Sequence, residues 1–388
     1  MSTGPENGNE PHLFGRKEVK MWRLFENYNL EELVEKVTWI QEMKGVPQDP
    51  IHHAEGDVFT HTQMVVEALL NLVEFNQLKE ADQHQLIAAA LMHDIEKRST
   101  TFIENGRVRS PGHAKKGEKT VREILYRNGK TPFAIRENIA KLVRLHGLPL
   151  WAIEKPDFER VLLSASLNVN TSHLYILAKA DALGRICADQ NDLLDRLEYF
   201  KGLCQELRCW GQAYPFESDL SRFNYFINEG ASRFYDPYGD KPFEVTLLSA
   251  LPGSGKDSWI KNNKPEEPII SLDDMRRNLK IKPTDKSGNG KVIQAAKNKA
   301  RTYLRKQQPF IWNATNITGQ LRSQLIQLFA DYGAGVRIVY LEVPYQTLLQ
   351  RNKTRQHPLP PAVLERMIRK LEPPVKSECT ELVLKTDY

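Results

Sequence analysis

The chain has 388 residues, of which 40% are hydrophobic, and a formal net charge of +5 at pH 7. This length and apolar content are enough for two ordinary hydrophobic cores, so we expect two domains. No apolar run approaches the length of a membrane span, and the polar start lacks the apolar segment of a signal peptide, so a soluble cytoplasmic protein is expected. The four cysteines form no CxxC pair, which argues against a disulfide framework or a zinc ribbon.

The positive charge is concentrated in the C-terminal part of the chain. Residues 241–388 contain 25 Lys and Arg against 14 Asp and Glu, a balance of +11 that leaves −6 for residues 1–240. Such a basic half suggests a polyanionic partner. Charge alone supports a solvated basic surface about as well as a polyanionic partner, so the motifs have to distinguish these two interpretations.

The N-terminal part is predicted to be helical. Residues 1–20 have the composition of a disordered tail, whereas residues 21–234 space their apolar residues three or four positions apart, and this period is typical of amphipathic helices. This segment is therefore expected to form one all-helical domain. The expected helices are residues 30–43, 62–75, 83–92, 113–126, 132–145, 171–187 and 192–209.

A linker is expected at residues 235–241, because residues 228–241 break the helical pattern with two glycines and an Asp-Pro pair. After it, strand-like runs at 243–248, 268–272, 309–312 and 336–343 alternate with helical stretches at 292–307, 321–332 and 362–371. This alternation predicts a parallel sheet covered by helices over residues 242–388. The expected fold class is multidomain, with an α domain followed by an α/β domain.

A glycine-rich loop follows the first expected strand of the second domain. Its glycines let backbone amides turn toward one anion at the start of the next helix, and Lys256 adds a cation for the terminal phosphates of a nucleotide. A glycine-rich turn without a nucleotide is the weaker reading. Asp257 occupies the position where a Ser or Thr usually coordinates magnesium, so either Asp257 coordinates directly or Ser258 compensates. The candidate nucleotide-binding residues are Gly253, Ser254, Gly255, Lys256, Asp257 and Ser258.

Three further segments place charged or polar residues after strands or on a late helix. One strand is followed by Asp273-Asp274-Met-Arg276, the next by Asn313-Ala-Thr-Asn, and the late helix carries Arg351 and Arg355. In an open α/β sheet, ligands lie beyond the carboxyl ends of the strands, so these residues are expected to face the phosphates. The alternative is that Asp273 and Asp274 only cap a helix and that the two arginines lie on a solvated face.

Together these segments resemble the P-loop polynucleotide kinases. The resemblance implies that Asp273 is the general base for an acceptor 5′-hydroxyl and that Arg276 holds an acceptor phosphate. It also implies that Arg351 and Arg355 are lid arginines, and that Lys256 and the loop bind ATP or another NTP with Mg²⁺. These roles suit phosphoryl transfer, in which positioning and charge stabilisation provide most of the catalysis.

Two features of this segment leave alternatives open. The phage enzyme of that family has an aspartate where this chain has Ala314, so an acidic contact is either missing or supplied by Asn313. The basic stretch at residues 280–306 is either a phosphate-tracking groove beside the acceptor arginine, which its position favours, or a solvated surface.

Histidines and aspartates recur along the helical part. Such residues suit a borderline divalent metal, and an adjacent His-Asp pair lets one helix deliver two ligands to the same site. Any one of these histidines alone would more often be a core residue, but their joint occurrence favours a metal site. The candidate metal ligands are His61, His93, Asp94, His113, His146 and Asp181.

The residues around these candidates resemble the HD superfamily, and among its members the HD domains attached to bacterial tRNA nucleotidyltransferases. The matching stretches are His53 to Thr62, Leu91 to Lys97, Gly112-His113, Leu142 to His146 and Ala180 to Arg185. The resemblance implies that His61, His93, Asp94 and Asp181 bind one divalent transition metal. It also implies that His113 and His146 hold a second metal or the substrate phosphate.

The remaining residues of this part receive weaker assignments. The resemblance implies that Lys97 contacts phosphate, and Glu96 replaces the glycine that is usual in the family. His52 and His53 are expected to shape the approach to the metal rather than to bind it. His84 and His173 lack matching context and are expected to be structural.

The order of the two halves resembles the bacterial HD-Pnk enzymes, in which an HD phosphohydrolase is fused to a polynucleotide kinase. The resemblance implies RNA end repair, with phosphorylation of 5′-hydroxyl ends and removal of 2′-, 3′- or 2′,3′-cyclic phosphate. The implied partners are RNA ends, or DNA ends, and a separate RNA ligase, with no membrane. Two rivals remain. One is a small-molecule kinase fused to an HD nucleotide phosphohydrolase, and the other is a nucleotide-sensing regulator.

Overall fold

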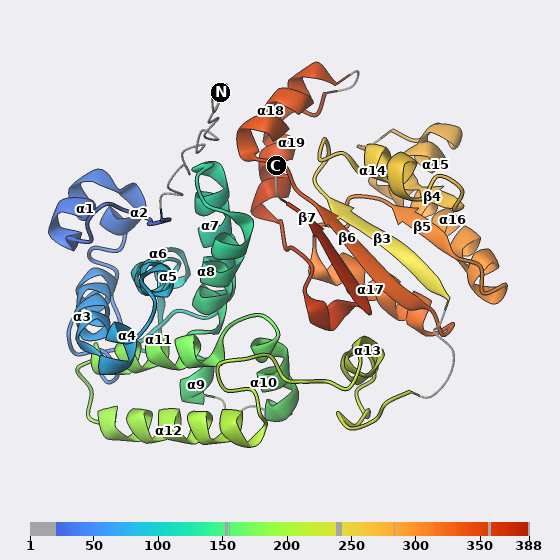
Figure 1. The fold of residues 1–388 in the computed structure, drawn as a ribbon. Helices are drawn as coiled ribbons and strands as arrows, with labels where there is room; N and C mark the ends of the chain where they lie inside the picture. Colours follow the sequence, from blue (N-terminus) through green and yellow to red (C-terminus); the bar gives the residue numbers. More distant parts are fainter. Residues whose placement is uncertain are drawn as a thin grey trace, which may run out of the picture.

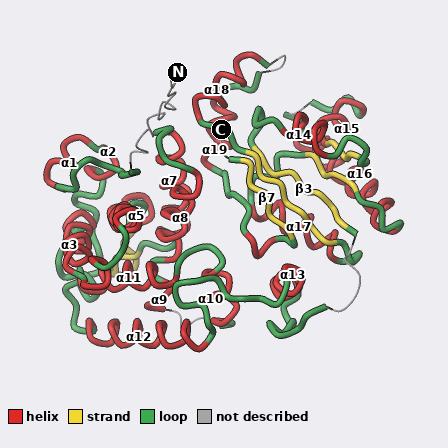
Figure 2. Tube along the Cα trace, in the orientation of Figure 1, coloured by secondary structure: helices red, strands yellow, loops and turns green. Residues whose placement is uncertain are grey.

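The computed structural model describes residues 21–151, 154, 156–237, 243–282, 284–355 and 358–386. The expected disordered tail and residues 238–241 of the expected linker lie outside this range. Figure 1 shows a helical domain and an α/β domain side by side, and Figure 2 shows that the strands lie almost entirely in the second of them. The expected boundary at residues 235–241 stays a prediction.

The helical domain packs its elements around one large core. Helix α5 is buried along Leu86 to Met92, and its neighbours are α3, α8 and α11. Two helices start at side-chain caps, with Asp57 accepting from Thr60 at α3 and Asn170 accepting from Ser172 and His173 at α11. The helices of this domain are α1 (Leu30–Lys36), α2 (Thr38–Gln41), α3 (Val58–Asn71), α4 (Val73–Asn76), α5 (Glu80–Met92), α6 (Lys97–Thr100), α7 (His113–Arg127), α8 (Phe133–Leu145), α9 (Leu148–Trp151), α10 (Phe158–Ser166), α11 (Thr171–Leu183) and α12 (Gln190–Glu206).

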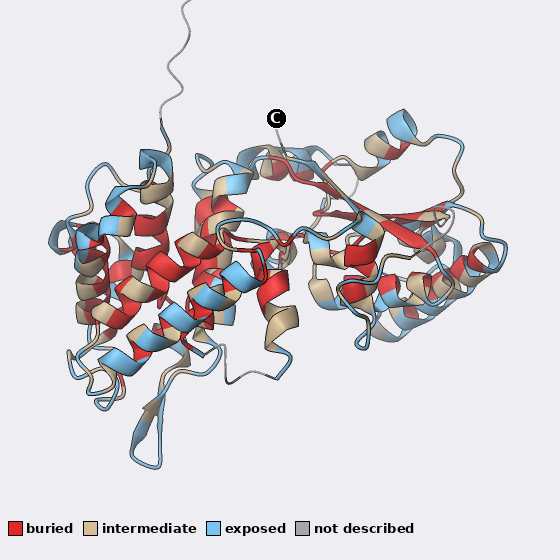
Figure 3. Ribbon diagram, turned by 60° about the horizontal axis from the view of Figure 1, so that its bottom comes forward, coloured by how far each residue is buried: buried red, intermediate tan, exposed pale blue. Residues whose placement is uncertain are grey.

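The helical character of this domain is confirmed, but the described residues depart from the expected elements. A two-stranded antiparallel hairpin, β1 (Phe102–Glu104) and β2 (Arg107–Arg109), separates α6 from α7 and projects from the domain (Figure 3). Asn105 and Gly106 form its turn with φ angles of 51° and 75°. Asn-Gly is the sequence that such two-residue turns favour, so this signal was present in the sequence.

Two of the expected helices are divided. Extended backbone at Val37 separates α1 from α2, where a single helix was expected over residues 30–43. Extended backbone at Leu72 separates α3 from α4, where a single helix was expected over residues 62–75.

The α/β domain contains a five-stranded sheet in the order β4-β5-β3-β6-β7, and all neighbouring strands are parallel. The expected parallel sheet is therefore confirmed, and the last strand, β7, was not expected. The elements are β3 (Glu244–Ala250), α14 (Lys256–Asn263), β4 (Ile269–Ser271), α15 (Leu272–Asn278), α16 (Lys286–Arg305), β5 (Phe310–Asn313), α17 (Gly319–Ala330), β6 (Gly335–Leu341), α18 (Tyr345–Thr354), α19 (Pro361–Arg369), η2 (Lys376–Glu378) and β7 (Glu381–Lys385).

The two domains share an interface with buried apolar contacts as well as ion pairs. Helix α13 (Asp219–Ile227) precedes the expected linker, yet its Phe223 packs into the core of the α/β domain. Helix α7 packs against α19, and both lie at the junction of the two domains in Figure 1. The Arg136 guanidinium of α8 donates to both carboxylate oxygens of Glu342, at 2.7 and 2.9 Å. This interface ties α7 and α8 to the end of β6 and to the helices that follow it.

Buried residues fill the centres of both domains (Figure 3). The central strands of the sheet are almost wholly inaccessible, as their continuous apolar sequences require when both faces are covered. In the described part of the chain, none of the helices combines the length and apolar character that crossing a bilayer requires.

Candidate active sites

Five segments of the helical domain bring the candidate metal ligands together. His61 lies on α3, His93 and Asp94 directly follow α5, His113 begins α7, His146 follows α8, and Asp181 lies on α11. His61 Nε2 is 3.2 Å from an Asp181 oxygen, and His93 Nε2 is 3.2 Å from Asp94 Oδ2. His113 Nε2 is 3.3 Å from Asp94 Oδ1. The structure therefore gathers all six sequence candidates into one cluster.

Backbone contacts fix how the histidine rings face this cluster. The Nδ1 atoms of His93, His113 and His146 lie 2.7, 2.8 and 2.7 Å from the carbonyl oxygens of residues 90, 110 and 143, respectively. A carbonyl only accepts, so each Nδ1 carries a hydrogen, and Nε2 is the nitrogen that holds the lone pair when the ring is neutral. This is how metal-binding histidines are usually oriented.

The donor atoms fit a cation. Asp94 Oδ1 is buried and accepts no hydrogen bond from any described residue, although His113 Nε2 is 3.3 Å away. A buried carboxylate oxygen without a hydrogen-bond donor is costly, and a cation bound between Asp94 Oδ1 and the neighbouring ring nitrogens would satisfy it. Two groups of donors meet the spacing of a metal site, His61-His93-Asp94 and Asp94-His113-His146, and Asp94 belongs to both.

Burial and neighbouring charges shift the pKa values of several candidate ligands. Burial raises the pKa of Asp94, but Lys97 and His93 outweigh it and hold this pKa well below its usual value. Arg185 likewise lowers the pKa of Asp181 against the effect of burial. Burial lowers the pKa of His146 to about 3, so its ring is neutral near pH 7. Metal ions bind ionised carboxylates and neutral imidazoles, so these three residues meet the condition, whereas Asp94 raises the pKa of His93 against burial and a metal would have to replace its proton.

Glu55 was not predicted to be a site residue, and His53 was expected only to shape the approach to the metal. In the structure both residues lie beside His61. A Glu55 oxygen lies 2.8 Å from Nδ1 of both His53 and His61, so Glu55 orients the His61 ring. These three residues also form a further group with the spacing of a metal site. Burial lowers the pKa of His53 to about 4, against the effect of Glu55, and keeps the ring neutral. The signal was available, since His53 and Glu55 lie in the stretch that resembles the HD superfamily.

Two neighbours of the His-Asp pair have defined contacts. Lys97 Nζ lies 2.7 Å from both Asp94 Oδ2 and Gln48 Oε1, so this lysine touches the metal ligand itself. Glu96 accepts from Thr120 at 2.8 Å and pairs with Lys116 at 2.9 Å, both on α7. The carboxylate that replaces the usual glycine therefore fastens the turn after α5 to the helix that carries His113.

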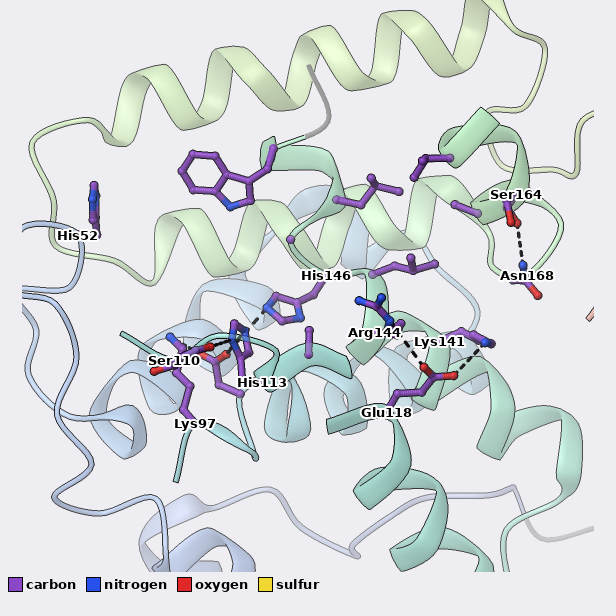
Figure 4. A pocket seen from close by; sticks show the side chains of 18 of the residues that line it. His52, Lys97, Ser110, His113, Glu118, Lys141, Arg144, His146, Ser164 and Asn168 are labelled. Carbon is purple, nitrogen blue, oxygen red and sulfur yellow. Dashed lines mark hydrogen bonds and ion pairs between the residues drawn. The ribbon is translucent and has the colours of Figure 1, made fainter. Parts of the chain in front are cut away.

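A cavity of about 950 Å³ opens from this cluster. Figure 4 shows Lys97, His113 and His146 at one end, and Ser164 and Asn168 at the other. Arg144, Lys141 and Glu118 lie between the two ends. The cavity is large enough for a nucleotide-sized ligand to reach the metal ligands.

In the α/β domain, the glycine-rich loop joins the central strand β3 to α14. Gly253 and Gly255 adopt φ angles of +92° and +95°, which side-chain-bearing residues rarely adopt, so both positions need glycine. The buried Ser254 hydroxyl has no hydrogen-bond partner in the described residues. Burial lowers the pKa of Lys256 to about 8, while Asp257 and Asp273 oppose this effect. The loop is thus shaped to receive an anion at the start of α14.

Asp257 is held by the end of the neighbouring strand. Asn313, the last residue of β5, donates its amide to Asp257 Oδ1 at 2.9 Å. P-loop enzymes commonly pair a loop hydroxyl with a strand carboxylate at this place, so here the carboxylate and the neutral partner have exchanged positions. Asp257 and Ser258 are both exposed on the first turn of α14, so it is the contact with Asn313 that favours Asp257 as the Mg²⁺ ligand.

The remaining kinase candidates surround the loop. Asp273 pairs with Arg276 on α15, and Arg276 also donates to Asn289 at 2.9 Å. Because β4, β5 and β3 are adjacent and parallel, their carboxyl ends bring Asp273 toward the loop. Arg351 Nη1 lies 3.3 Å from the carbonyl oxygen of Gly253. Arg355, at the end of α18, adds to the lowering of the Lys256 pKa, and burial is the larger cause.

Comparison with known proteins finds a separate family match in each of the two domains. The family model described as an HD domain matches residues 58–186, and the one described as an AAA domain matches residues 245–374. The chain thus carries a helical HD domain followed by a P-loop α/β domain of kinase-like type.

Two individual proteins share parts of the chain. A multifunctional CCA protein from Halorhodospira halophila is 32% identical over 107 residues, which are 28% of this chain and 23% of that protein. The match therefore spans less than a quarter of the length of this relative. A "putative kinase" from Chloroflexus aurantiacus, known from a crystal structure, is 16% identical in sequence to the matched part of this chain. The structural match has a TM-score of 0.33 and covers 37% of this chain and 88% of the other.

Proposed function

We propose that this protein repairs RNA ends with two active sites. The P-loop domain transfers a phosphoryl group from ATP or another NTP to a 5′-hydroxyl, and the HD domain removes 2′-, 3′- or 2′,3′-cyclic phosphate. The observation that supports the HD half best is the buried Asp94 oxygen, which has no hydrogen-bond partner in the described residues, on a residue that belongs to two groups with the spacing of a metal site.

In the HD site, His61, His93, Asp94 and Asp181 would hold one divalent cation, and His113 and His146 a second one or the phosphate. A bound cation supplies Lewis acidity toward the phosphate group and activates water for hydrolysis. The chain's own contribution is to orient the ring nitrogens through backbone carbonyls and Glu55. The Lys97 ammonium keeps Asp94 ionised, and it lies close enough to the ligands to attract a phosphate oxygen.

In the kinase site, the loop amides and Lys256 bind the phosphates of the donor. Asp257 would hold Mg²⁺, which neutralises phosphate charge, while Asn313 orients its carboxylate. Asp273 accepts the proton of the acceptor hydroxyl, and its ion pair with Arg276 sets its direction. Arg351, which already contacts the loop, and Arg355 stabilise charge on the transferring phosphoryl group.

The acceptor decides between a polynucleotide kinase and a small-molecule kinase. The purified protein is incubated with labelled ATP, Mg²⁺ and a 5′-hydroxyl RNA oligonucleotide, with free nucleosides as competitors. We expect label on the RNA, and we expect labelling to fall steeply with salt, because several Lys and Arg displace counterions from the strand. If free nucleosides outcompete the RNA, the protein is a small-molecule kinase. If no acceptor is labelled although ATP binds, the nucleotide-sensing regulator is favoured.

A further inference from the structure

The cavity at the HD site extends well past the metal ligands. Its lining runs from His113 and His146, along Lys141 and Arg144 of α8, to Ser164 and Asn168 near α10 (Figure 4). A volume of about 950 Å³ lies near the top of the range of about 300–1,000 Å³ that accommodates a ligand of drug size. A terminal phosphate and its nucleoside fill only the part nearest the metal ligands, so the cavity has room for the neighbouring nucleotide.

The middle of this cavity carries an incompletely paired cation. The only acidic partner of Arg144 in the described residues is Glu118, 3.8 Å from its Nε, which is beyond hydrogen-bond distance. Glu118 is already engaged by Arg122 and Lys141, each at 2.8 Å. The Arg144 side chain is 42% exposed. Its guanidinium therefore keeps donors for an anion that enters the cavity.

Other cations of the cavity wall are already occupied. Arg160 pairs with Asp157 at 3.0 Å and donates to the carbonyl oxygen of Glu229 at 2.8 Å. Arg185 is paired with Asp181 at 2.8 Å. Arg144 is thus the part of the wall best suited to a second phosphate, and Lys141 beside it, which shares Glu118 with Arg122, adds positive charge. A guanidinium binds two phosphate oxygens with good geometry.

An aromatic side chain lines the same cavity. Trp151 is 37% exposed, and the Arg196 guanidinium lies 4.9 Å from the centre of its ring. This contact lies over one face of the indole, and the ring itself lines the cavity. Nucleobases stack on such exposed rings with little regard to sequence.

We propose that this cavity binds the nucleotide next to the terminal one, with Arg144 and Lys141 on the internucleotide phosphate and Trp151 against a base. The HD site would thereby select the ends of polynucleotides over free mononucleotides. This proposal rests on the proposed hydrolase function, and it assigns strand recognition to the acidic half of the chain as well as to the basic one.

The test compares three substrates of the full-length protein: a nucleoside 3′-phosphate, a dinucleotide with a 3′-phosphate, and the same dinucleotide with an uncharged methylphosphonate linkage. We expect kcat/KM for the charged dinucleotide to exceed that for the mononucleotide by at least about tenfold, and to exceed that for the methylphosphonate by a similar factor. Arg144→Ala should remove most of both advantages, mainly through KM. Trp151→Ala should lower the advantage of the charged dinucleotide over the mononucleotide.

Lys115→Ala is the matched control, since it removes an exposed cation of α7 that does not line the cavity. Equal turnover of the mononucleotide and the charged dinucleotide by the unmodified protein would overturn the proposal and leave the hydrolase standing. An Arg144→Ala effect that persists with the methylphosphonate would also overturn it, because the arginine would then not act on the internucleotide phosphate. Hydrolysis of none of the three substrates would instead refute the hydrolase function itself.

Discussion

Asp94 is the residue on which the HD site depends most, since it belongs to both groups of metal donors. Its carboxylate also contacts Lys97, His93 and His113. The P-loop site has a comparable residue in Lys256, whose charge is sensitive to pH because the side chain is buried.

Asp94→Asn should remove metal and phosphatase activity together, because an amide cannot supply the charge that two cations share. The loss should exceed the roughly 10–100-fold that removal of an outer-shell partner costs. Elemental analysis of the purified protein and phosphate release from 3′-phosphorylated RNA measure the two effects, and kinase activity serves as the internal control. A variant that retains its metal content would show that the cluster is structural.

ATP binding should weaken as the pH rises above about 8. The pKa of Lys256 in the free protein is lowered to about 8 by burial, so the lysine is charged below that pH and increasingly neutral above it. ATP needs the charged form, and binding must then take up a proton, which costs up to about tenfold in affinity per pH unit. Titration with a fluorescent ATP analogue between about pH 6.5 and 9.5 measures how the affinity for ATP depends on pH. Lys256→Met should bind weakly with a flat profile, and an equally steep profile in that variant would assign the titration to another group.

At the scale of elements, the HD site requires α3 and α11 to lie unusually close, since they carry His61 and Asp181. A Cβ built on Gly184, just after α11, would lie 2.7 Å from Val65 Cγ2 and 2.8 Å from the backbone nitrogen of Val65 on α3. The backbone of a helix cannot yield as a flexible side chain does. Gly184 therefore sets the spacing of the two helices.

Gly184→Ala should consequently push α3 away from α11, lower the unfolding free energy by about 1–3 kcal/mol, and weaken metal binding. Denaturant titration and metal content test this pair of effects. Gly202→Ala on the exposed face of α12 is the matched control, since a Cβ there meets nothing within 4 Å and alanine suits a helix better than glycine. If both variants behave alike, the close approach of the two helices has no bearing on the site.

Much of the fold could be predicted from sequence patterns that extend over whole helices and strands. The helical period, the alternation of strands and helices, and the loop around Lys256 all predict elements that the structure contains. Short elements were missed, namely the hairpin at Asn105-Gly106 and strand β7, because a few residues carry little periodicity. For the site, the residue types of the metal ligands were readable, but the Glu55 contact to His61 and the exchange of roles between Asp257 and Asn313 depend on distances across the fold.

At the scale of the whole molecule, the two domains are joined by buried charges. Arg136 and Glu342 have side-chain exposures of 2% and 8%, and the Tyr340 hydroxyl donates to Glu342 at 2.6 Å. Glu342 immediately follows β6, and Arg136 lies on α8, the helix that leads to His146. The arrangement of the two domains therefore bears on the geometry of the HD site.

Glu342→Ala should destabilise the protein by about 3 kcal/mol, because it leaves Arg136 buried with Glu137 as its remaining acidic partner. Calorimetry should show a lower first transition and separation of the two domains into two transitions. Glu381→Ala breaks the exposed pair with Arg337 and should cost less than about 1 kcal/mol. A single unshifted transition in Glu342→Ala would mean that the interface does not couple the domains.

The most direct test of the two-site account uses one RNA oligonucleotide that carries a 5′-hydroxyl and a 3′-phosphate, incubated with ATP, Mg²⁺ and a divalent transition metal. Mass spectrometry of terminal fragments reads each end separately. The unmodified protein should convert both ends, Lys256→Ala only the 3′ end, and Asp94→Asn only the 5′ end, while a mixture of the two variants should convert both. Loss of both conversions in either folded variant, or an RNA whose ends are both unchanged by the unmodified protein, would contradict the account.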